Sequence, residues 1–338
     1  MRSSFVQALV FVLSLPAPWM QAAEPVVKPV IPAVQESIGV LRSLGTISIS
    51  KTADWVAITP DAVWVAGAKP NVVRKIDKDT NKVVLSVALP GEPCAGLAVA
   101  FGSLWVPLCG RGGEVARVDE RTGRLVASIG QGPASEGGIT ASRYSIWCTA
   151  DDAGTLLRID PATNRVRQRV RVAPGSHNPV VVQNQLWITS GTGNLVTAVD
   201  TASGTVIGTV GTGPQPRFLT SGGGSVWVLN QGDGSVTRID PVSRRVVATI
   251  AAGIAGHGGD IAYGGGMVWA SIFAIPLSQI DPASNRVVRQ WKGAGGDSLR
   301  LGHNAIWLTD YHRGTVTRFA IPKPRSKDSR NGAGTLRQ

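Results

Sequence analysis

The sequence predicts an all-β fold, a seven-bladed β-propeller made of four-stranded antiparallel blades. A repeat of about 40 residues, rich in Val, Gly and turn-forming residues, is typical of propeller blades. Seven such units account for most of the 338 residues and leave short ends rather than a second domain. Each unit carries one tryptophan between apolar neighbours, at intervals of 38 to 42 residues: Trp64, Trp105, Trp147, Trp187, Trp227, Trp269 and Trp307.

Each unit contains four short β-branched runs separated by Gly, Pro, Asn and Asp, which is the pattern of antiparallel strands joined by hairpins. We label these runs strands A to D. In the fifth unit they are Arg217–Thr220, Ser225–Leu229, Ser235–Asp240 and Arg245–Ile250. The tryptophan lies in the middle of strand B with aliphatic neighbours. We therefore predict that the seven tryptophans pack blade against blade.

An aspartate ends strand C in six units, and in most of them a turn with Asn or Gly follows. Asn and Gly accept the positive φ values that such turns need, and Asp caps the local backbone. Because six near-identical copies occur, we interpret these residues as structural rather than functional. The aspartates are Asp77, Asp119, Asp160, Asp200, Asp240 and Asp281.

The seventh unit has no strand D of its own. Residues Thr315 to Ile321 supply a strand C, but Pro322 then opens a polar tail. At the other end of the chain, Leu44 to Ile49 resembles a strand D and precedes the first complete unit. We predict that this N-terminal strand completes the last blade and closes the ring, which removes the exposed sheet edge of an open array.

The two ends of the chain have different expected roles. Residues 1–23 have the features of an export signal, with a positive start, a short apolar core and a small-residue pair before Glu24. Residues 24–40 are expected to be a proline-rich linker, 41–321 the propeller, and 322–338 a basic disordered tail. After residue 20 the sequence has no apolar run long enough to cross a bilayer.

Export gives the cysteines a meaning, because disulfides persist in oxidising compartments. Cys94 precedes strand A of the second unit and Cys109 follows its strand B, so the two fall almost opposite each other across the hairpin. We predict a disulfide between them. Two separate small apolar residues, or a metal pair that would need further ligands, are the alternatives. Cys148 stands where other units have an aliphatic residue, which predicts a buried substitute.

The formal net charge of +12 overstates the charge of the folded body. Without Arg2 and the tail from Lys323 onward, the charge falls to about +7. A basic exported protein can meet anionic polymers or membrane surfaces. Nucleic acid is not an expected partner, because no basic helix or aromatic RNA-binding pattern accompanies the charge. We expect a monomer in the periplasm or a secreted one.

Function is expected where the units differ from one another. In a propeller the strands A line the channel, so the D–A and B–C loops share one face and the repeated turns occupy the other. Positions counted from each tryptophan place varied polar residues on the first face, where a concave rim favours binding. The candidate ligand-binding residues are Asp54, Glu136, His177, Asn178, Arg217, Asn230, Gln231, Asp260 and His312.

The units resemble the YVTN-type repeats and the streptogramin B (virginiamycin B) lyase-like group of seven-bladed propellers, over roughly residues 45–321. The resemblance lies in segments such as Gly102–Val106, Pro161–Val166 and Val236–Pro241. It implies a carbon–oxygen lyase that opens a cyclic depsipeptide by elimination at its ester. A histidine general base would act there, with supporting His and Glu residues around Mg²⁺ in the last two blades.

The implied catalytic residues map onto this chain with departures. The family's sixth-blade histidine lies one position from His257. Its seventh-blade histidine aligns with Asp297, the preceding Glu with Gly295, and the Glu after the seventh tryptophan with Tyr311, beside Asp310. The candidate catalytic residues are therefore His257, Asp297, Asp310 and Tyr311.

Other interpretations of the histidines stay open. His257 can be a loop residue hydrogen-bonded within a glycine-rich segment, and not a general base. His177 and His312 share the predicted face and can join a metal site, although they come from different blades with no close ligand spacing.

Two classes of function follow. The first is a non-catalytic propeller that binds a small molecule, a glycan or a protein at its rim, for which no cofactor is predicted. The second is a lyase or hydrolase acting on a cyclic ester, for which Mg²⁺ is expected.

Overall fold

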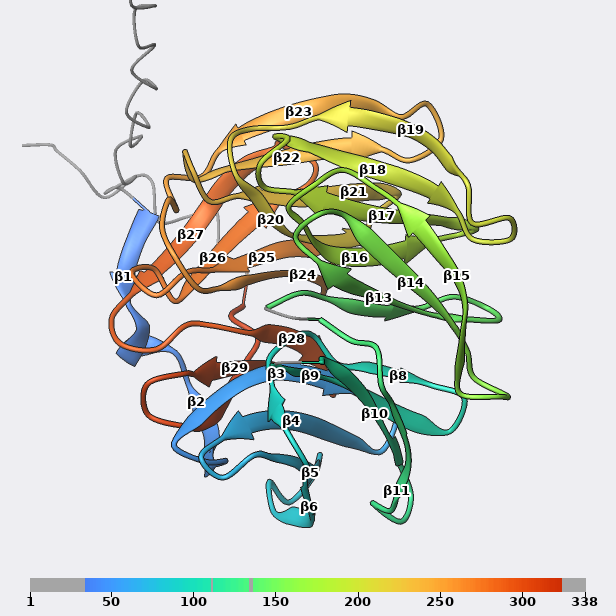
Figure 1. Ribbon diagram of the computed structural model, residues 1–338. Helices are drawn as coiled ribbons and strands as arrows, with labels where there is room; N and C mark the ends of the chain where they lie inside the picture. The colour runs from blue at the N-terminus through green and yellow to red at the C-terminus, as the bar shows by residue number, and fades with distance from the viewer. Residues whose placement is uncertain (1–33, 111, 134–135, 324–338) are drawn as a thin grey trace, which may run out of the picture.

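The protein forms a ring of seven β-sheet blades (Figure 1). The structure, a computed structural model, describes residues 34–110, 112–133 and 136–323. Every blade has four antiparallel strands or their equivalent, which confirms the predicted all-β propeller. The expected export signal at 1–23, the first part of the expected linker and the tail from 324 lie outside the described residues. Within the described residues, no helix has the length and apolar character needed to span a membrane.

The strands follow one another in chain order from the channel outward. Blade 1 contains β3 (Thr52–Ile58), β4 (Ala62–Ala68), β5 (Val72–Asp77) and β6 (Val83–Ala88). Blade 2 contains β7 (Glu92–Pro93), β8 (Ala98–Ala100), β9 (Ser103–Cys109), β10 (Glu114–Asp119) and β11 (Leu125–Ile129), and blade 3 contains β12 (Ile139–Ala141), β13 (Ile146–Asp151), β14 (Thr155–Asp160) and β15 (Arg165–Arg171). Blade 4 contains β16 (Ser176–Val182), β17 (Gln185–Ser190), β18 (Leu195–Asp200) and β19 (Val206–Gly211).

The remaining blades keep this order. Blade 5 contains β20 (Pro216–Gly222), β21 (Ser225–Asn230), β22 (Ser235–Asp240) and β23 (Arg245–Ala251); blade 6 contains β24 (Asp260–Gly264), β25 (Met267–Ser271), β26 (Leu277–Asp281) and β27 (Arg286–Lys292); blade 7 contains β28 (Leu299–Gly302), β29 (Ala305–Asp310) and β30 (Thr315–Ala320). The four strands of blade 5 agree with their predicted bounds to within two residues at each end.

The fourth strand of blade 7 comes from the N-terminal region, as predicted. Strand β2 (Ser43–Ser48) pairs antiparallel with β30, with Ser43 opposite Phe319 and Ser48 opposite Thr315. In Figure 1 the blue strand β2 therefore belongs to the same blade as the red strands from the other end of the chain. The ring is closed through hydrogen bonds between the two ends of the propeller.

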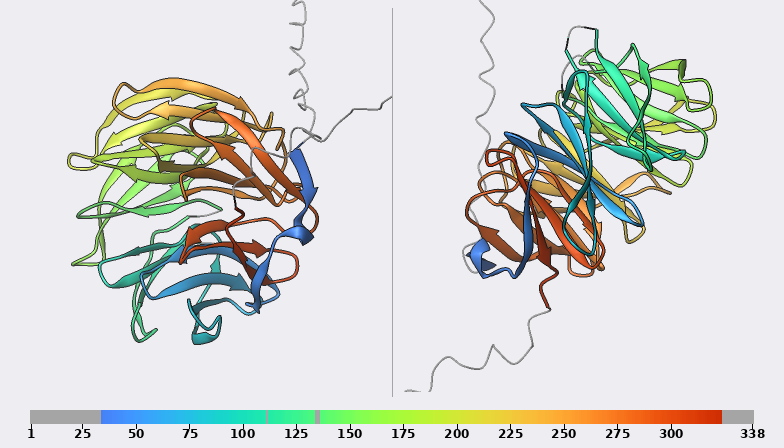
Figure 2. Two further views of the ribbon diagram at one scale, coloured as in Figure 1. Left: turned by 180° about the vertical axis from the view of Figure 1, so that it is seen from behind. Right: turned by 90° about the horizontal axis from the view of Figure 1, so that it is seen from below.

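Residues 35–40 form regular structure, although the sequence places them in a proline-rich linker. Strand β1 (Gln35–Ser37) pairs parallel with β27 on the outer edge of blade 6, and a 3-10 turn, η2 (Ile38–Val40), leads on to β2. Figure 2 shows this segment running along the outside of the ring. An ion pair of 3.2 Å between Glu36 Oε2 and Arg289 Nη2 helps to hold the segment there. The spacing of residues in the sequence does not reveal this contact.

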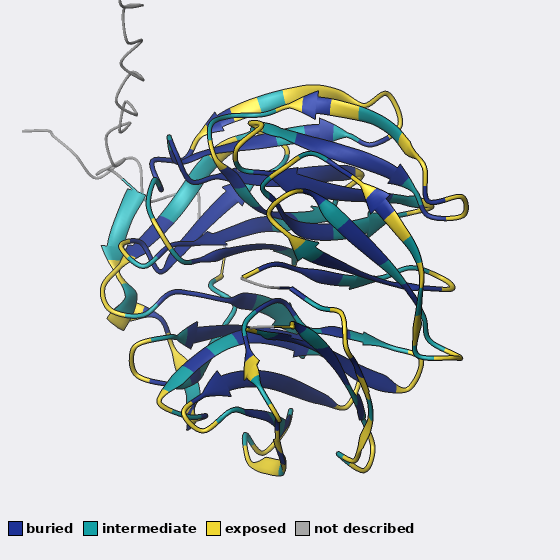
Figure 3. Ribbon diagram, viewed as in Figure 1, coloured by how far each residue is buried: buried dark blue, intermediate teal, exposed yellow. Residues whose placement is uncertain are grey.

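The seven repeat tryptophans are completely buried, as the sequence predicts, and most of them lie under a cation from the neighbouring strand C. In blade 5, Arg238 lies 4.8 Å from the ring centroid of Trp227. Its guanidinium then donates to the carbonyl of Pro282 (2.8 Å) and to Asn285 Oδ1 (3.0 Å), in the C–D turn of the next blade. The arginine thus covers the tryptophan and joins two blades. Figure 3 shows that the inner strands of the blades are mostly buried and that many of the outer turns are exposed.

The same contact crosses the seam where the ring closes. Arg318 of blade 7 donates to the carbonyl of Lys78 (2.6 Å) and to Asn81 Oδ1 (3.1 Å) in the C–D turn of blade 1. In these turns the repeated aspartates accept backbone N–H groups; for example, Asp119 accepts from Thr122 at 2.7 Å. Hydrogen bonds lower the pKa of all six aspartates: a side-chain hydroxyl is the largest cause at Asp77, Asp119 and Asp281, and a backbone N–H is the largest at Asp160, Asp200 and Asp240. The structural interpretation of the repeated turns agrees with this geometry.

The predicted disulfide joins Cys94 and Cys109, with 5.6 Å between their Cα atoms. It holds β7 against the end of β9, where Glu92 pairs with Cys109. Cys148 is buried, as predicted, and burial raises the pKa of its thiol to about 12. The disulfide therefore fixes the loop that enters blade 2, and the buried thiol is a packing residue.

We expect the double substitution Cys94→Ser and Cys109→Ser to lower the free energy of unfolding by about 3 kcal/mol, because the bridge closes a loop of 15 residues. Denaturant titration measures this value. A reducing agent should weaken the wild type by a similar amount and leave the double variant unchanged. If mass spectrometry of alkylated wild type finds three free thiols, the disulfide is absent in solution.

Candidate binding site

The D–A and B–C loops bring unrepeated side chains together at one end of the ring. We call this region the channel mouth and define it by Asp54, Glu136, His177, Arg217, Asp297 and Tyr311. Burial raises the pKa of the Tyr311 phenol, and the negative charges of Asp54, Glu92, Asp297 and Glu136 raise it further. Residues of blades 1, 2, 3 and 7 therefore act on one tyrosine in a common electrostatic environment.

Aromatic side chains from blades 1, 4 and 5 meet inside the ring. Trp55 of blade 1 and Phe218 of blade 5 are each 2% exposed, and their ring centroids lie 6.0 Å apart. His177 of blade 4 meets Phe218 edge-on at 5.8 Å. Because blades 1 and 5 are not neighbours in the ring, the Trp55–Phe218 contact crosses the channel.

His177 is neutral in this environment. Burial lowers its pKa to about 3, and the positive charge of Arg217 adds to the effect. Neither ring nitrogen has a hydrogen-bond partner among the described residues. Its Nε2 atom lies 3.9 Å from Glu136 Oε1, which is too far for a direct hydrogen bond. The imidazole can therefore accept a hydrogen bond from a group that enters the mouth.

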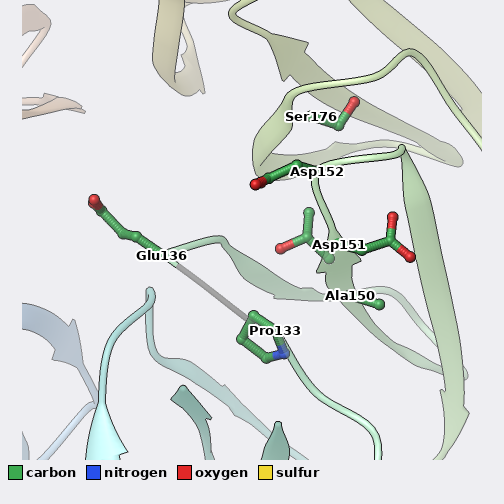
Figure 4. Close-up of a pocket in the computed structure, with 7 residues that line it drawn as sticks. Pro133, Glu136, Ala150, Asp151, Asp152 and Ser176 are labelled. Carbon is green, nitrogen blue, oxygen red and sulfur yellow. The ribbon is translucent and has the colours of Figure 1, made fainter. Parts of the chain in front are cut away.

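Glu136 of blade 3 is paired with a cation from blade 5. Its Oε2 atom lies 2.5 Å from Arg217 Nη2, and both side chains remain partly exposed. Beside Glu136 lies a small hollow with space for about one water molecule. Figure 4 shows Glu136 and Asp152 directing their carboxylates to one side of this hollow and Asp151 to the other. The hollow shares Glu136 with the mouth and is too small for an organic ligand.

Asp54 and Asp297 form a pair of carboxyl groups joined by a side-chain hydrogen bond, which requires a proton on one of them. Burial and the charge of Asp297 raise the pKa of Asp54 well above its ordinary value. Asp54 itself is half-buried, and burial is the largest cause of this raised pKa. Burial also raises the pKa of Asp297 to about 7.

The loop before β24 holds Asp297 in place. The N–H of Gly259 donates to Asp297 Oδ1 at 2.8 Å. Gly259 has φ +94°, and a Cβ there would lie 1.9 Å from the carbonyl oxygen of Ser271, so this close approach requires glycine. On the neighbouring Gly258, a Cβ would lie within 2.6 Å of the ring of Phe273. The aromatic ring thus covers the loop that binds the carboxylate.

Phe273 belongs to an aromatic cluster on the rim. Its ring centroid lies 6.3 Å from that of Tyr311 and 5.1 Å from that of His312, and the latter two are 5.5 Å apart. The cluster joins the B–C loops of blades 6 and 7. It gives the mouth an aromatic wall next to the acidic pair.

Several predicted ligand-binding residues have internal partners instead. Asn178 Oδ1 accepts from the N–H of Leu219 (3.3 Å), and Asn230 Nδ2 donates to Ser235 and Thr237 (both 2.9 Å). Gln231 Nε2 donates to the carbonyl of Gly258 (2.7 Å). Asp260 is 1% exposed and binds Ser298, the N–H of Leu299 and the guanidinium of Arg300. These four side chains support the loops of the mouth, so any ligand contact by them stays a prediction.

The histidine proposed as a base and its neighbours are more loosely placed. The His257 side chain is exposed, and its ring takes part in none of the hydrogen bonds or ion pairs found among the described residues. Asp310 Oδ1 accepts from the N–H of Arg313 (3.0 Å), and its Oδ2 lies 3.7 Å from Arg313 Nε. Asp297 and Tyr311 share the acidic environment of the mouth, whereas His257 and Asp310 stand at its margin.

The described residues contain no group of three or more His, Cys, Asp or Glu side chains arranged to hold a metal ion. Glu92 also raises the pKa of Tyr311, and the sequence analysis misses it. It lies 13 positions before Trp105, whereas Asp54, His177, Arg217 and Asp297 each lie ten positions before the tryptophan of their blade.

No family model matches the chain, and no curated protein matches it. Among solved structures, the fold is similar to the crystal structure of BamB from Moraxella catarrhalis. The TM-score is 0.61 and the sequence identity 14%, over 85% of this chain and 99% of that chain. At this identity the likeness shows the fold alone, so function has to be argued from the mouth itself.

Proposed function

We propose that the protein is an exported, non-catalytic β-propeller that binds a small molecule, a glycan or an extracytoplasmic protein at its channel mouth. The observation that carries the proposal is the meeting of unrepeated charged and aromatic side chains from different blades at one end of the ring. The opposite end carries the repeated aspartate turns, which have local backbone partners. A concave rim with few placed polar groups is the usual form of a binding site.

Export to the periplasm or the medium is the second part of this proposal. It is supported by the Cys94–Cys109 disulfide, because such bonds are rare in reducing compartments. The expected export signal lies outside the described residues and gives no structural support. We propose a monomer, because ring closure by β2 leaves blade 7 complete within one chain.

We expect a thermal-shift screen, with compounds grouped as cations, anions, neutral glycans and cyclic esters, to find ligands that raise the melting temperature. A ligand at 100 times its Kd adds about 2.7 kcal/mol to the stability of the folded state. The substitution Arg217→Ser at the mouth should reduce this effect. The matched substitution Arg121→Ser, in a C–D turn at the opposite end, should leave it unchanged. Ligands sensitive only to Arg121 would place the site at the wrong end of the ring.

The alternative is a lyase or hydrolase of the streptogramin B lyase-like group. It is favoured by the family resemblance and by the position of Asp297 and Tyr311 in the mouth. It has less support from His257, because a general base needs an oriented partner and a substrate within hydrogen-bond reach. Product analysis of cyclic esters, with and without Mg²⁺, tests it directly. Turnover that persists in His257→Ala would remove that residue from the mechanism.

A further inference from the structure

The acidic pair differs from the other buried or half-buried carboxylates of the mouth in having no cation. Glu136 has Arg217 at 2.5 Å, and Asp260 has the guanidinium of Arg300. No lysine, arginine or histidine in the described part of the chain forms an ion pair with Asp54 or Asp297. Buried carboxylates without a cation are costly unless one is protonated or a cation arrives. The pair therefore has room for one external positive charge.

A second, independent observation indicates what kind of group could enter. His177 is buried, and both of its ring nitrogens have no partner in the described structure. Because the ring is neutral, one nitrogen is available as a hydrogen-bond acceptor. With the carboxyl oxygens of the pair and of Glu136, the mouth offers mainly acceptors. A ligand that carries only donors, such as an ammonium or guanidinium group, matches this set.

The aromatic wall adds a third feature. Phe273 covers the loop whose Gly259 N–H binds Asp297, and the rings of Tyr311 and His312 make tilted contacts with it. Aromatic faces attract cations and also pack against alkyl chains. An organic cation with an alkyl stem can use both the carboxyl pair and the aromatic wall, whereas a bare metal ion has no alkyl part to pack against that wall.

We propose that Asp54 and Asp297, walled by Phe273, Tyr311 and His312, bind a primary ammonium or guanidinium group carried on an alkyl stem. This inference rests on the proposed binding function and specifies the chemistry of its ligand. The same group can belong to a free amine or to a lysine or arginine side chain of a protein partner. The net positive charge of the protein is no barrier, since charges beyond about 8 Å are screened at physiological salt.

Below pH 7 Asp297 carries a proton in the free protein, and a cation that binds the pair must displace that proton. Because the pKa of Asp297 is raised to about 7 in the free protein, affinity should weaken below pH 7, by up to about tenfold per pH unit. Above pH 7 the affinity should level off. The charged and titratable groups that act on the pair from the surrounding loops are Glu136, Asp260 and Tyr311.

The test is calorimetric titration of the full chain with cadaverine and agmatine at pH 7.5 and 150 mM salt. Pentan-1-ol and glutarate serve as neutral and anionic controls of similar length. Both cations should bind at least tenfold more tightly than the controls. Repeating the titration near pH 6 in two buffers of different ionisation enthalpy should show the release of about one proton on binding. Equal binding of cadaverine and pentan-1-ol would overturn the proposal.

Variants place the site. Asp54→Asn with Asp297→Asn should reduce cadaverine affinity at least tenfold and abolish proton release. Tyr311→Leu, which leaves the acidic pair intact, should reduce affinity severalfold without changing the proton count. Asp119→Asn in a C–D turn at the opposite end is the matched control and should bind like wild type. Undiminished affinity in both the double variant and Tyr311→Leu would overturn the proposal, even if the double variant proves hard to fold.

Two further comparisons distinguish a free amine from a protein side chain as the ligand, and failure of the cation inference from failure of the proposed binding function. The capped peptide Gly-Lys-Gly should bind more tightly than Gly-Gln-Gly if a protein side chain is the ligand, whereas preference for cadaverine over both peptides indicates a free amine. If cations fail but another compound class gives a thermal shift sensitive to Arg217→Ser, the cation inference is wrong and the mouth still binds. If no class gives such a shift, the proposed function fails as well.

Discussion

Deleting residues 34–50 is expected to lower the melting temperature by about 10 °C or more. The deletion removes the buried side chains of Ile47 and Ile49, each worth about 1.5–3 kcal/mol of burial. It also leaves the outer edge of β30 without the strand that pairs with it from Ser43 to Ser48. An open edge invites pairing with other chains, so aggregation on heating should increase. Scanning calorimetry and light scattering measure the two effects.

Two further chains show whether strand pairing is the cause. Deleting only residues 34–40 removes β1 and η2 but keeps β2, and should cost much less. Moving residues 41–50 to the C-terminus after residue 323 restores strand D by an ordinary hairpin, because the N–H of Ala320 already donates to the carbonyl of Arg42 (3.0 Å). This permuted chain should recover most of the stability. An unchanged melting temperature after deletion of residues 34–50 would rule out closure by β2.

The blades were predictable because the sequence features that specify them are local and repeated. Tryptophan spacing, turn residues and β-branched runs each act within about 40 residues, and they agree in every unit. The hydrogen bond from Arg238 to the carbonyl of Pro282 in the next blade could not be predicted from the same pattern. It joins residues more than 40 positions apart, and it depends on how far one blade turns against the next. Segment 35–40 escaped prediction for a similar reason, because its partner β27 is a distant strand.

The mouth was predictable in position but not in pairing. Asp54, His177, Arg217 and Asp297 all lie ten residues before the tryptophan of their blade, so they share one level of the ring. Their partners depend on side-chain length and burial. Arg217 of blade 5 reaches past blade 4 to Glu136 of blade 3, whereas Asp54 and Asp297 meet across the seam between blades 1 and 7. Register alone cannot distinguish these outcomes from others.

Asp297→Asn is expected to stabilise the protein at pH 8 and to have little effect at pH 4. The folded state raises the pKa of Asp297 from its ordinary value of 3.8 to about 7, so it holds the proton more tightly than the unfolded chain. Wild-type stability should therefore be highest, with respect to this group, below pH 4. It should fall as pH rises from 4 to 7 and then stay level. Asparagine can keep the hydrogen bond from Gly259 without carrying the charge. The gain at pH 8 should reach roughly 4 kcal/mol, measured by urea unfolding across this pH range.

The same substitution one blade earlier should have the opposite sign, which separates a charge effect from a general effect of asparagine. Asp260 is as deeply buried as Asp297, but it holds the guanidinium of Arg300, and Asp260→Asn leaves that cation without its partner. We expect a loss of about 1–3 kcal/mol at pH 8. The turn aspartates with lowered pKa weaken all three proteins equally in acid, so they cancel in the comparison. A natural chain that retains Asp297 despite this cost keeps a negative charge that folding does not need. If Asp297→Asn is no more stable than wild type at pH 8, that cost does not exist, and the argument for an external cation at this pair loses its energetic basis.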